Sequence, residues 1–278
     1  MIKTIGKFTV SEYIYGPKIG IIGLGFVGDA IQASFGGSGF RLVRNDPAKG
    51  YTDTYDALKE CEGIFVCVPS PQRQDGSCDS SILEDVLTNL KGYKGVIISK
   101  VTATPDIYER LQNEYDNLVY SPEFLTAANA APDYLKENWA VIGGSVLAYK
   151  KEAERIIALS KPLNSVQFCS IGEAALVKYT INSFLATKVI FMNELSDIAQ
   201  QNRYNWNTIR NCLALDERIG KSHTQVPGPD GLFGFGGMCF PKDTSALLYY
   251  ANCLDIDLNV LNSAVKKNTI LRLKKSEE

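Results

Sequence analysis

Short apolar runs recur between Lys18 and Ser170 and alternate with stretches of helical periodicity. Polar residues do not interrupt these runs at every second position, as they would in strands with one face in water. Strands that alternate with helices in this way predict a doubly wound parallel sheet. The strands are expected at Lys18–Leu24, Phe40–Asn45, Gly63–Val68, Gly95–Val101, Asn117–Tyr120, Trp139–Ile142 and Val166–Cys169.

The pattern becomes helical after Ser170. A long helix is predicted from Glu173 to about Gln200. The Ser170 hydroxyl and the Glu173 carboxylate, three residues apart, can satisfy each other's free backbone amides at its start. A helix of this length spans roughly 40 Å at 1.5 Å per residue, which is long enough to leave one domain and begin another.

The chain after Asn207 is also predicted to be helical, apart from a glycine- and proline-rich loop at Lys221–Met238. A loop of this length is more often functional than idle. We therefore expect an α/β domain over residues 1–170 and a smaller all-helical domain over residues 171–278.

The composition is that of an ordinary soluble globular protein. The 278 residues are 45% hydrophobic and 22% charged, with a formal net charge of −2 and no block of like charges. This gives no electrostatic signature for nucleic acid or an anionic membrane, so a small-molecule partner is expected. No apolar run approaches the roughly 20 residues of a membrane helix and no signal sequence is visible, which predicts a cytoplasmic protein.

The cysteines and the single histidine limit the chemistry further. Seven cysteines occur without a CxxC pair, and His223 is the one histidine. The cysteines are therefore expected to be free thiols in a reducing compartment. A zinc site lacks clustered ligands, and a Ser-His-Asp triad would depend on His223. No metal site is predicted.

A glycine turn, Gly23-Leu-Gly25-Phe26-Val27-Gly28, follows the first predicted strand and precedes a helical stretch. In this context the first glycine permits a tight turn, the second lets the backbone approach a pyrophosphate, and the third lets the helix pack on the strand. Asp46 ends the second strand 18 residues after Gly28, where its carboxylate can bond the ribose hydroxyls and favours NAD over NADP. Arg44 keeps NADP open, although a solvated charge is the preferred interpretation. The first domain is thus predicted to be Rossmann-like and to bind a dinucleotide.

A second glycine-rich segment runs from Gly234 to Thr244. Cys239 would lie there at a helix N-terminus beside Lys242, where the dipole and the cation favour a thiolate nucleophile. Lys178 and Asn182, four residues apart, share one face of the long helix. Together they could stabilise an oxyanion or polarise a carbonyl, although a buried-helix lysine more often reaches to solvent.

These stretches resemble the UDP-glucose/GDP-mannose dehydrogenase family and occur in the family's order. The resemblance extends from Lys18 to about Asn268 and implies an NAD-dependent enzyme that oxidises the primary alcohol of a nucleotide sugar to a carboxylate in two hydride transfers. UDP-glucose would be the leading substrate, with GDP-mannose or an N-acetylhexosamine nucleotide as runners-up. Besides the glycine turn, the matching stretches are Phe65-Val-Cys-Val-Pro-Ser-Pro71, Ser121-Pro-Glu-Phe-Leu125, Lys178-Tyr-Thr-Ile-Asn182, Asp216-Glu-Arg-Ile-Gly220 and Gly236-Gly-Met-Cys-Phe-Pro-Lys-Asp243.

The resemblance also implies a role for each matched residue. Cys239 would attack the intermediate aldehyde to give a thiohemiacetal, and the second hydride transfer would convert this to a thioester that water hydrolyses. Lys178 and Asn182 match the oxyanion-stabilising pair. Further catalytic matches are Asp243, a carboxylate near the thiol, Glu123, a general acid/base, and Thr102, which holds water. The cofactor would contact Gly23, Gly25, Phe26, Val27, Gly28, Asp46, Val68, Pro69 and Lys242. The substrate would contact Phe124, Leu125, Phe235, Gly236 and Gly237.

Arg218 matches an arginine that reaches into the pocket of the partner subunit, which implies a homodimer formed through the long helix. Departures from the family's pattern leave alternatives open. In Lys100-Val-Thr-Ala-Thr-Pro105 either Thr102 or Thr104 could hold the water, and Ala127 stands where many members have a second glutamate. His223, in a loop that is longer than in many members, is interpreted as a loop side chain.

The family's third domain, which helps to bind the nucleotide base, is expected to be missing from a chain that ends at Glu278. The pocket would then be more open, or another chain would complete it. Two other interpretations remain. A β-hydroxyacid or 6-phosphogluconate type dehydrogenase would share the first domain and the long helix but would not need Cys239. A non-catalytic NAD or nucleotide-sugar binding protein would fit the missing domain and Ala127.

Overall fold

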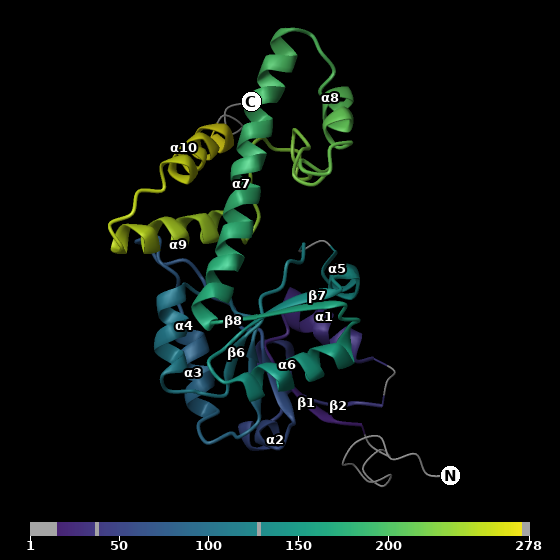
Figure 1. The fold of residues 1–278 in the computed structure, drawn as a ribbon, viewed down its shortest axis with the longest axis vertical. Helices are drawn as coiled ribbons and strands as arrows, with labels where there is room; N and C mark the ends of the chain where they lie inside the picture. The colour runs from purple at the N-terminus through teal and green to yellow at the C-terminus, as the bar shows by residue number, and fades with distance from the viewer. Residues whose placement is uncertain (1–15, 37–38, 127–128, 274–278) are drawn as a thin grey trace. The chain divides into compact units, whose positions relative to one another are not determined.

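The seven predicted strands and one short strand that was not predicted, β3, form one eight-stranded sheet (Figure 1). The computed structural model describes residues 16–36, 39–126 and 129–273. The strand order is β3-β2-β1-β4-β5-β6-β7-β8. Each predicted strand is confirmed to within two residues at either end. The strands are β1 (Lys18–Ile22), β2 (Arg41–Asp46), β3 (Tyr51–Thr52), β4 (Gly63–Val66), β5 (Val96–Ser99), β6 (Leu118–Tyr120), β7 (Trp139–Gly143) and β8 (Ser165–Cys169).

The sheet is mostly parallel, which confirms the doubly wound fold class. Strands β2, β1, β4, β5 and β6 pair in parallel, and β8 is parallel to β7. Two pairings depart from this pattern, because β3 runs antiparallel to β2 and β7 runs antiparallel to β6. The β6–β7 ladder has one residue pair, Tyr120 with Gly143. Chain direction is not encoded in an apolar run, so the sequence could not predict these reversals.

Helices cover both faces of the sheet. Neighbouring residues of a strand point to opposite faces, and in β4 both Ile64 and Phe65 are completely buried. Helix α6 packs on β5, β6 and β7, and α1 packs against α5. The helices between the strands are α1 (Phe26–Ser34), the 3-10 turn η2 (Pro47–Lys49), α2 (Tyr55–Lys59), α3 (Ser81–Asn89), α4 (Pro105–Gln112), α5 (Ala130–Lys136) and α6 (Leu147–Ser160).

The predicted long helix is α7 (Ile171–Gln201), and it starts at the expected serine-glutamate pair. The backbone amide of Ser170 donates to Glu173 Oε2 over 2.7 Å, and the Glu173 amide donates to Ser170 Oγ over 3.2 Å. These two bonds lower the number of unsatisfied amides in the first turn. Hydrogen bonds from Ser170 hold the pKa of Glu173 below its usual range.

Three further helices follow: α8 (Trp206–Leu213), α9 (Phe240–Cys253) and α10 (Asn259–Leu273). Lys221–Met238 contains neither helix nor strand, as predicted. An apolar cluster joins α7, α10 and the end of this loop, and its buried members are Ala186, Ile190, Phe235, Ala264 and Leu271. This second part of the chain therefore has a core of its own.

The chain divides into two compact units. One contains Met1–Ser70 and Asp79–Lys178, and the other contains Pro71–Cys78 and Tyr179–Glu278. The short segment Pro71–Cys78 joins the helical unit because Gln72 Nε2 and Ser245 Oγ lie 2.9 Å apart, and Ser245 Oγ donates to the Gly76 carbonyl over 3.2 Å. The sequence does not predict that Pro71–Cys78 belongs to the helical unit. The division of function between residues 1–170 and 171–278 stays a prediction.

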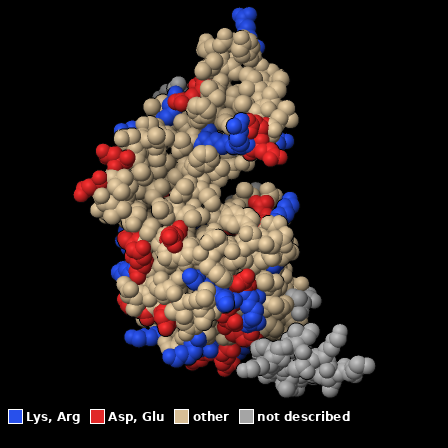
Figure 2. Space-filling view, viewed as in Figure 1, with Lys and Arg blue, Asp and Glu red and all other residues tan. Residues whose placement is uncertain are grey.

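Charged side chains are interspersed on the face drawn in Figure 2, where neither sign gathers into one field. Among the helices described, none combines the length and the apolar character that crossing a bilayer requires. The described residues also contain no group of three or more metal-ligating side chains.

Candidate functional site

The glycine turn after β1 has the geometry that a dinucleotide phosphate needs. Gly23 has φ +83°, and a Cβ there would lie 2.8 Å from the Cys67 backbone. A Cβ on Gly28 would lie 2.0 Å from the Gly23 carbonyl oxygen. By contrast, a Cβ on Gly25 would meet no atom within 4 Å. Internal packing thus requires the first and third glycines, whereas the space beside Gly25 is open to a ligand at the N-terminus of α1.

Asp46 is held at the edge of this turn. Its Oδ2 accepts a hydrogen bond from the Leu24 amide over 2.7 Å. A carboxylate held at this end of β2 can bond a ribose hydroxyl, so the residues present fit NAD. Phe26 begins α1 and is 54% exposed, whereas Val27 packs against the core of the sheet unit. Val68 and Pro69, the other predicted cofactor contacts, follow the end of β4 and are half-buried and exposed respectively.

Arg44 differs from its expected state as a solvated charge. Its guanidinium lies over the Tyr51 ring, 4.8 Å from the centroid, and its Nη1 lies 3.4 Å from Gln32 Oε1. Because this arrangement half-buries the side chain, Arg44 serves the packing of the β2–β3 edge.

Glu123 lies in a buried group of charges after β6. Its side chain is 6% exposed, and within the described residues its Oε2 has no hydrogen-bond partner. Burial raises the pKa of Glu123, while the ammonium groups of Lys178 and Lys100 act against that rise. A buried carboxyl with an elevated pKa and one open oxygen is suited to general acid/base chemistry.

Lys178 extends from α7 to the same segment. Its Nζ donates to the Glu123 carbonyl oxygen over 2.6 Å and lies 5.1 Å from the centre of the Phe124 ring. Phe124 in turn stacks on Trp139, with ring centroids 4.9 Å apart, and Leu125 packs against the core of the sheet unit. Lys178 is 6% exposed, so it does not reach to solvent as most helix-surface lysines do.

Lys100 is a further buried cation, for which the sequence predicts no role. It is 4% exposed, and its Nζ donates to Ser121 Oγ over 3.2 Å. Burial lowers the pKa of Lys100 to about 8, and the carboxylate of Glu123 partly offsets this effect. The available sequence signal is that Lys100 directly follows an apolar run, Val96–Ser99, and precedes the apolar Val101.

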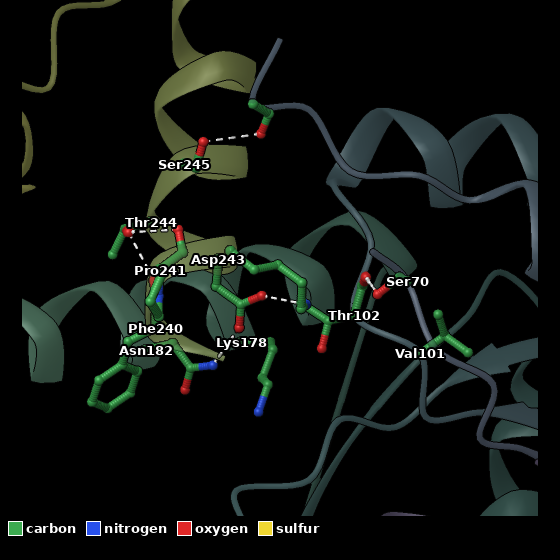
Figure 3. A network of polar contacts seen from close by, with 12 residues as sticks. Ser70, Val101, Thr102, Lys178, Asn182, Phe240, Pro241, Asp243, Thr244 and Ser245 are labelled. Carbon is green, nitrogen blue, oxygen red and sulfur yellow. Dashed lines mark hydrogen bonds and ion pairs between the residues drawn. The ribbon is translucent and has the colours of Figure 1, made fainter. Parts of the chain in front are cut away.

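The two candidate water-holding threonines have different environments. The Thr102 carbonyl oxygen accepts a hydrogen bond from Ser70 Oγ over 2.6 Å (Figure 3). Thr104 is 5% exposed and is the N-cap residue of α4. Which of them holds water stays a prediction, and Ala127 lies outside the described residues.

In the helical unit, Asp243 lies at the centre of a short polar network (Figure 3). Its carboxylate is 1% exposed and accepts from Asn182 Nδ2 and from Lys242 Nζ, each over 2.6 Å. Asn182 comes from α7, whereas Lys242 and Asp243 belong to the first turn of α9. This network joins the predicted oxyanion residue to the predicted thiol-side carboxylate.

Cys239 immediately precedes α9 and is exposed. Pro241 lies in the first turn of this helix, where its missing amide costs no hydrogen bond. The Lys242 ammonium, expected beside the thiol, bonds the Asp243 carboxylate. The structure thus places Cys239 at a helix N-terminus, one turn before Asp243, where an exposed thiol can act as a nucleophile.

The backbone before Cys239 is held by the last described helix. The Phe235 amide donates to Asn268 Oδ1 over 2.7 Å, so it is already engaged. Substrate contact by Phe235, Gly236 and Gly237 stays a prediction. Sequence reasoning missed Asn268, since an asparagine in a helix carries no local signal for a bond to a loop 33 residues away.

Two further predicted residues lie elsewhere in the helical unit. Arg218 is bonded to Asp216 of its own chain, with Nη2 and Oδ2 2.6 Å apart, and its side chain is 89% exposed. The His223 ring packs on Phe240, with centroids 5.5 Å apart, and its backbone has φ 61°. Burial, together with the nearby Lys188 charge, lowers the pKa of His223.

Sequence models of one known family match both parts of the chain. The model of the NAD binding domain of the UDP-glucose/GDP-mannose dehydrogenase family matches residues 43–162, and that of the central domain of the same family matches residues 172–270. The chain belongs to this family. The NAD-binding domain match agrees with the open glycine turn and identifies NAD as the cofactor of the family fold.

Curated relatives of the dehydrogenase family agree with this assignment. The chain is 30% identical to a putative UDP-glucose 6-dehydrogenase of Bacillus subtilis, over 84% of this chain and 63% of that protein. It is 31% identical to the UDP-glucose 6-dehydrogenase of Rickettsia felis, over 78% of this chain and 50% of that protein. The chain therefore spans between half and two thirds of the length of these two relatives.

Solved structures show the same fold. The UDP-glucose dehydrogenase of Pyrobaculum islandicum matches with a TM-score of 0.77 at 23% identity, covering 95% of this chain and 70% of that one. The 3-hydroxyisobutyrate dehydrogenase of Mycobacterium tuberculosis matches with a TM-score of 0.70 at 16% identity, covering 90% of this chain and 91% of that one. The fold is thus shared by dehydrogenases of nucleotide sugars and of a hydroxyacid, and the fold alone does not choose between them.

Proposed function

We propose that the chain catalyses the NAD-dependent oxidation of the primary alcohol of a nucleotide sugar to a carboxylate, with UDP-glucose as the favoured substrate. The observation that carries this proposal is the exposed thiol of Cys239 at the start of α9, one turn before a buried Asp243 that is bonded to Asn182 and Lys242. A hydroxyacid dehydrogenase has no need of such a thiol. The names of the curated relatives favour UDP-glucose.

In the proposed reaction the glycine turn would hold NAD, and each of the two oxidations would transfer one hydride to a separate NAD molecule and release one proton. Between them, the Cys239 sulfur bonds to the aldehyde carbon and its proton passes to the carbonyl oxygen, giving a thiohemiacetal. After the second oxidation has produced a thioester, water attacks the carbonyl carbon and the thiol leaves. The products are a carboxylate and a regenerated Cys239.

The remaining side chains supply charge and proton transfer in this scheme. Lys178 and Asn182 are one turn apart on α7 and would donate hydrogen bonds to the oxygen that becomes anionic. The elevated pKa of Glu123 suits a group that takes a proton from the alcohol and returns one later. Thr102 would hold the hydrolytic water, and Asp243 would keep Asn182 and Lys242 in place.

A homodimer through α7 is part of this proposal. Phe184, Phe191 and Ile198 are 66%, 55% and 58% exposed, and they follow one another at intervals of seven residues. Residues seven apart lie nearly on one line along a helix, so these side chains form an apolar stripe. A second copy of the chain would cover it, and Arg218 would then approach the other subunit.

The proposal is tested by measuring NADH formed per nucleotide sugar consumed, with NAD and a panel of UDP- and GDP-sugars. Two NADH per sugar are expected for the wild-type chain. Cys239→Ser should lose that turnover, whereas Cys212→Ser, which removes another exposed thiol, should retain it. One NADH per substrate with an indifferent Cys239 would support the hydroxyacid alternative. Bound NAD without any turnover would support a binding protein.

A further inference from the structure

The last helix, α10, bonds directly to the loop that leads to Cys239. Arg272 makes three of these bonds: Nε donates to the Phe235 carbonyl over 3.0 Å, Nη2 to the Gly234 carbonyl over 3.0 Å, and Nη1 to Asp230 Oδ2 over 2.6 Å. One helical turn earlier, Asn268 Oδ1 accepts from the Phe235 amide over 2.7 Å. We call Asn268 and Arg272 the α10 clamp.

The glycines of the loop are shaped by this clamp. Gly234 has φ +73°, and a Cβ there would lie 2.3 Å from Asn268 Oδ1. A Cβ on Gly236 would lie 2.7 Å from Arg272 Nη2. A side chain at either position would therefore displace the clamp residues. Packing against the clamp thus explains why both positions are glycine without involving a substrate.

Helix α7 holds the same loop from another side. Asn193 Oδ1 accepts from the Gly234 amide over 3.0 Å, and its own Nδ2 donates to the Val189 carbonyl over 2.7 Å. Asn193 is 2% exposed, so water does not compete with these bonds. The Phe235 ring is buried against Leu271 and Ala264 of α10. The backbone at Gly234 and Phe235 is thus fixed by polar contacts to two helices and by apolar packing.

We propose that Asn268 and Arg272 are positioning residues for the reaction, because they fix the loop that contains Gly236 and Gly237 and ends at Cys239. The catalytic consequence rests on the proposed function, in which Cys239 is the nucleophile. The α10 clamp itself does not depend on that function, because all of its contacts lie within the helical unit. A displacement of about 1 Å of a reacting group can cost on the order of 100-fold in rate.

Matched variants separate the clamp from general stability. Asn268 takes part as an acceptor through Oδ1, so Asn268→Asp retains the bond to the Phe235 amide and Asn268→Leu removes it. Arg272→Lys keeps a cation near Asp230 but cannot make three bonds in a fixed fork. Lys266→Ala removes a charge from an exposed position of the same helix and serves as the control.

The first readout is hydrogen–deuterium exchange of the peptide that covers residues 230–239, measured on the folded wild-type and variant chains. We expect Asn268→Leu and Arg272→Lys to exchange at least about tenfold faster there, because hydrogen bonds to the loop are removed. Asn268→Asp and Lys266→Ala should match the wild type. This readout does not require turnover, so it decides whether the clamp holds the loop even if no nucleotide sugar is oxidised.

The second readout is the split between kcat and KM. Asn268→Leu and Arg272→Lys should lower kcat by at least about tenfold and leave the KM for NAD unchanged, with Asn268→Asp restoring kcat. Unchanged loop exchange in both variants overturns the clamp. Faster exchange with wild-type kcat overturns its positioning role, and a lower unfolding temperature without either change shows that the residues are only structural.

Discussion

At the residue scale, the buried ammonium group of Lys100 is expected to make the stability of the sheet unit depend on pH. Burial lowers the pKa of Lys100 from 10.5 to about 8. Between these values the unfolded chain binds the proton and the folded chain releases it, so stability should rise with pH across this window. At pH 7, the charge on buried Lys100 should lower the free energy of unfolding by on the order of 3 kcal/mol, because a shift of one pKa unit corresponds to about 1.4 kcal/mol.

Lys100→Met should remove this rise. The measurement is the free energy of unfolding in urea at several values from pH 7 to 10.5, compared between the variant and the wild type, with Lys91→Met as an exposed control. The wild-type chain should gain stability relative to the Lys100 variant as the pH increases. If the stability of the two proteins changes with pH in the same way, burial does not lower the pKa of Lys100.

Candidate residues for the chemistry stand out in the sequence, while the residues that hold their loops in place do not. Glycine spacing and a helix start single out Cys239 and Asp46, whose roles stay predictions. Asn193 and Arg272 bond the backbone of a loop 41 and 38 residues away in sequence. Such contacts arise from tertiary packing, and no local periodicity encodes them.

At the element scale, the start of α7 is set by the Ser170 and Glu173 side chains. Ser170→Ala removes the hydroxyl that accepts from the Glu173 amide, and it should destabilise the chain by about 1 kcal/mol. Ser170→Thr keeps a hydroxyl and should cost less. Thermal or urea unfolding of both variants provides the measurement, and equal stability of Ser170→Ala and wild type would contradict a role for the cap.

Elements with a strong pattern were predicted well, and those without one were not. Runs such as Ile64–Val66 are apolar at every position, which favours a strand buried on both faces. Tyr51–Thr52 is a two-residue edge strand that offers no pattern. Burial also says nothing of direction, so the reversal of β7 required the three-dimensional path of the chain.

At the scale of the whole molecule, the apolar stripe of α7 is the surface proposed to bind a second copy of the chain. Phe191 lies in the middle of the stripe and is 55% exposed. In a two-fold symmetric dimer each residue of the interface occurs twice. Burying an aromatic side chain is worth about 1.5–3 kcal/mol, so the loss of both copies should weaken association at least about 100-fold.

We therefore expect the wild-type chain to dimerise and Phe191→Glu to be monomeric at micromolar concentration. Sedimentation velocity or light scattering over a dilution series measures the change. Gln200→Glu, which adds the same charge at an exposed position near the end of the same helix, should remain dimeric. A wild-type monomer at these concentrations would sink the homodimer proposal. If Phe191→Glu remains dimeric, the interface lies away from the α7 stripe. The prediction that Arg218 approaches the other subunit would then have no support.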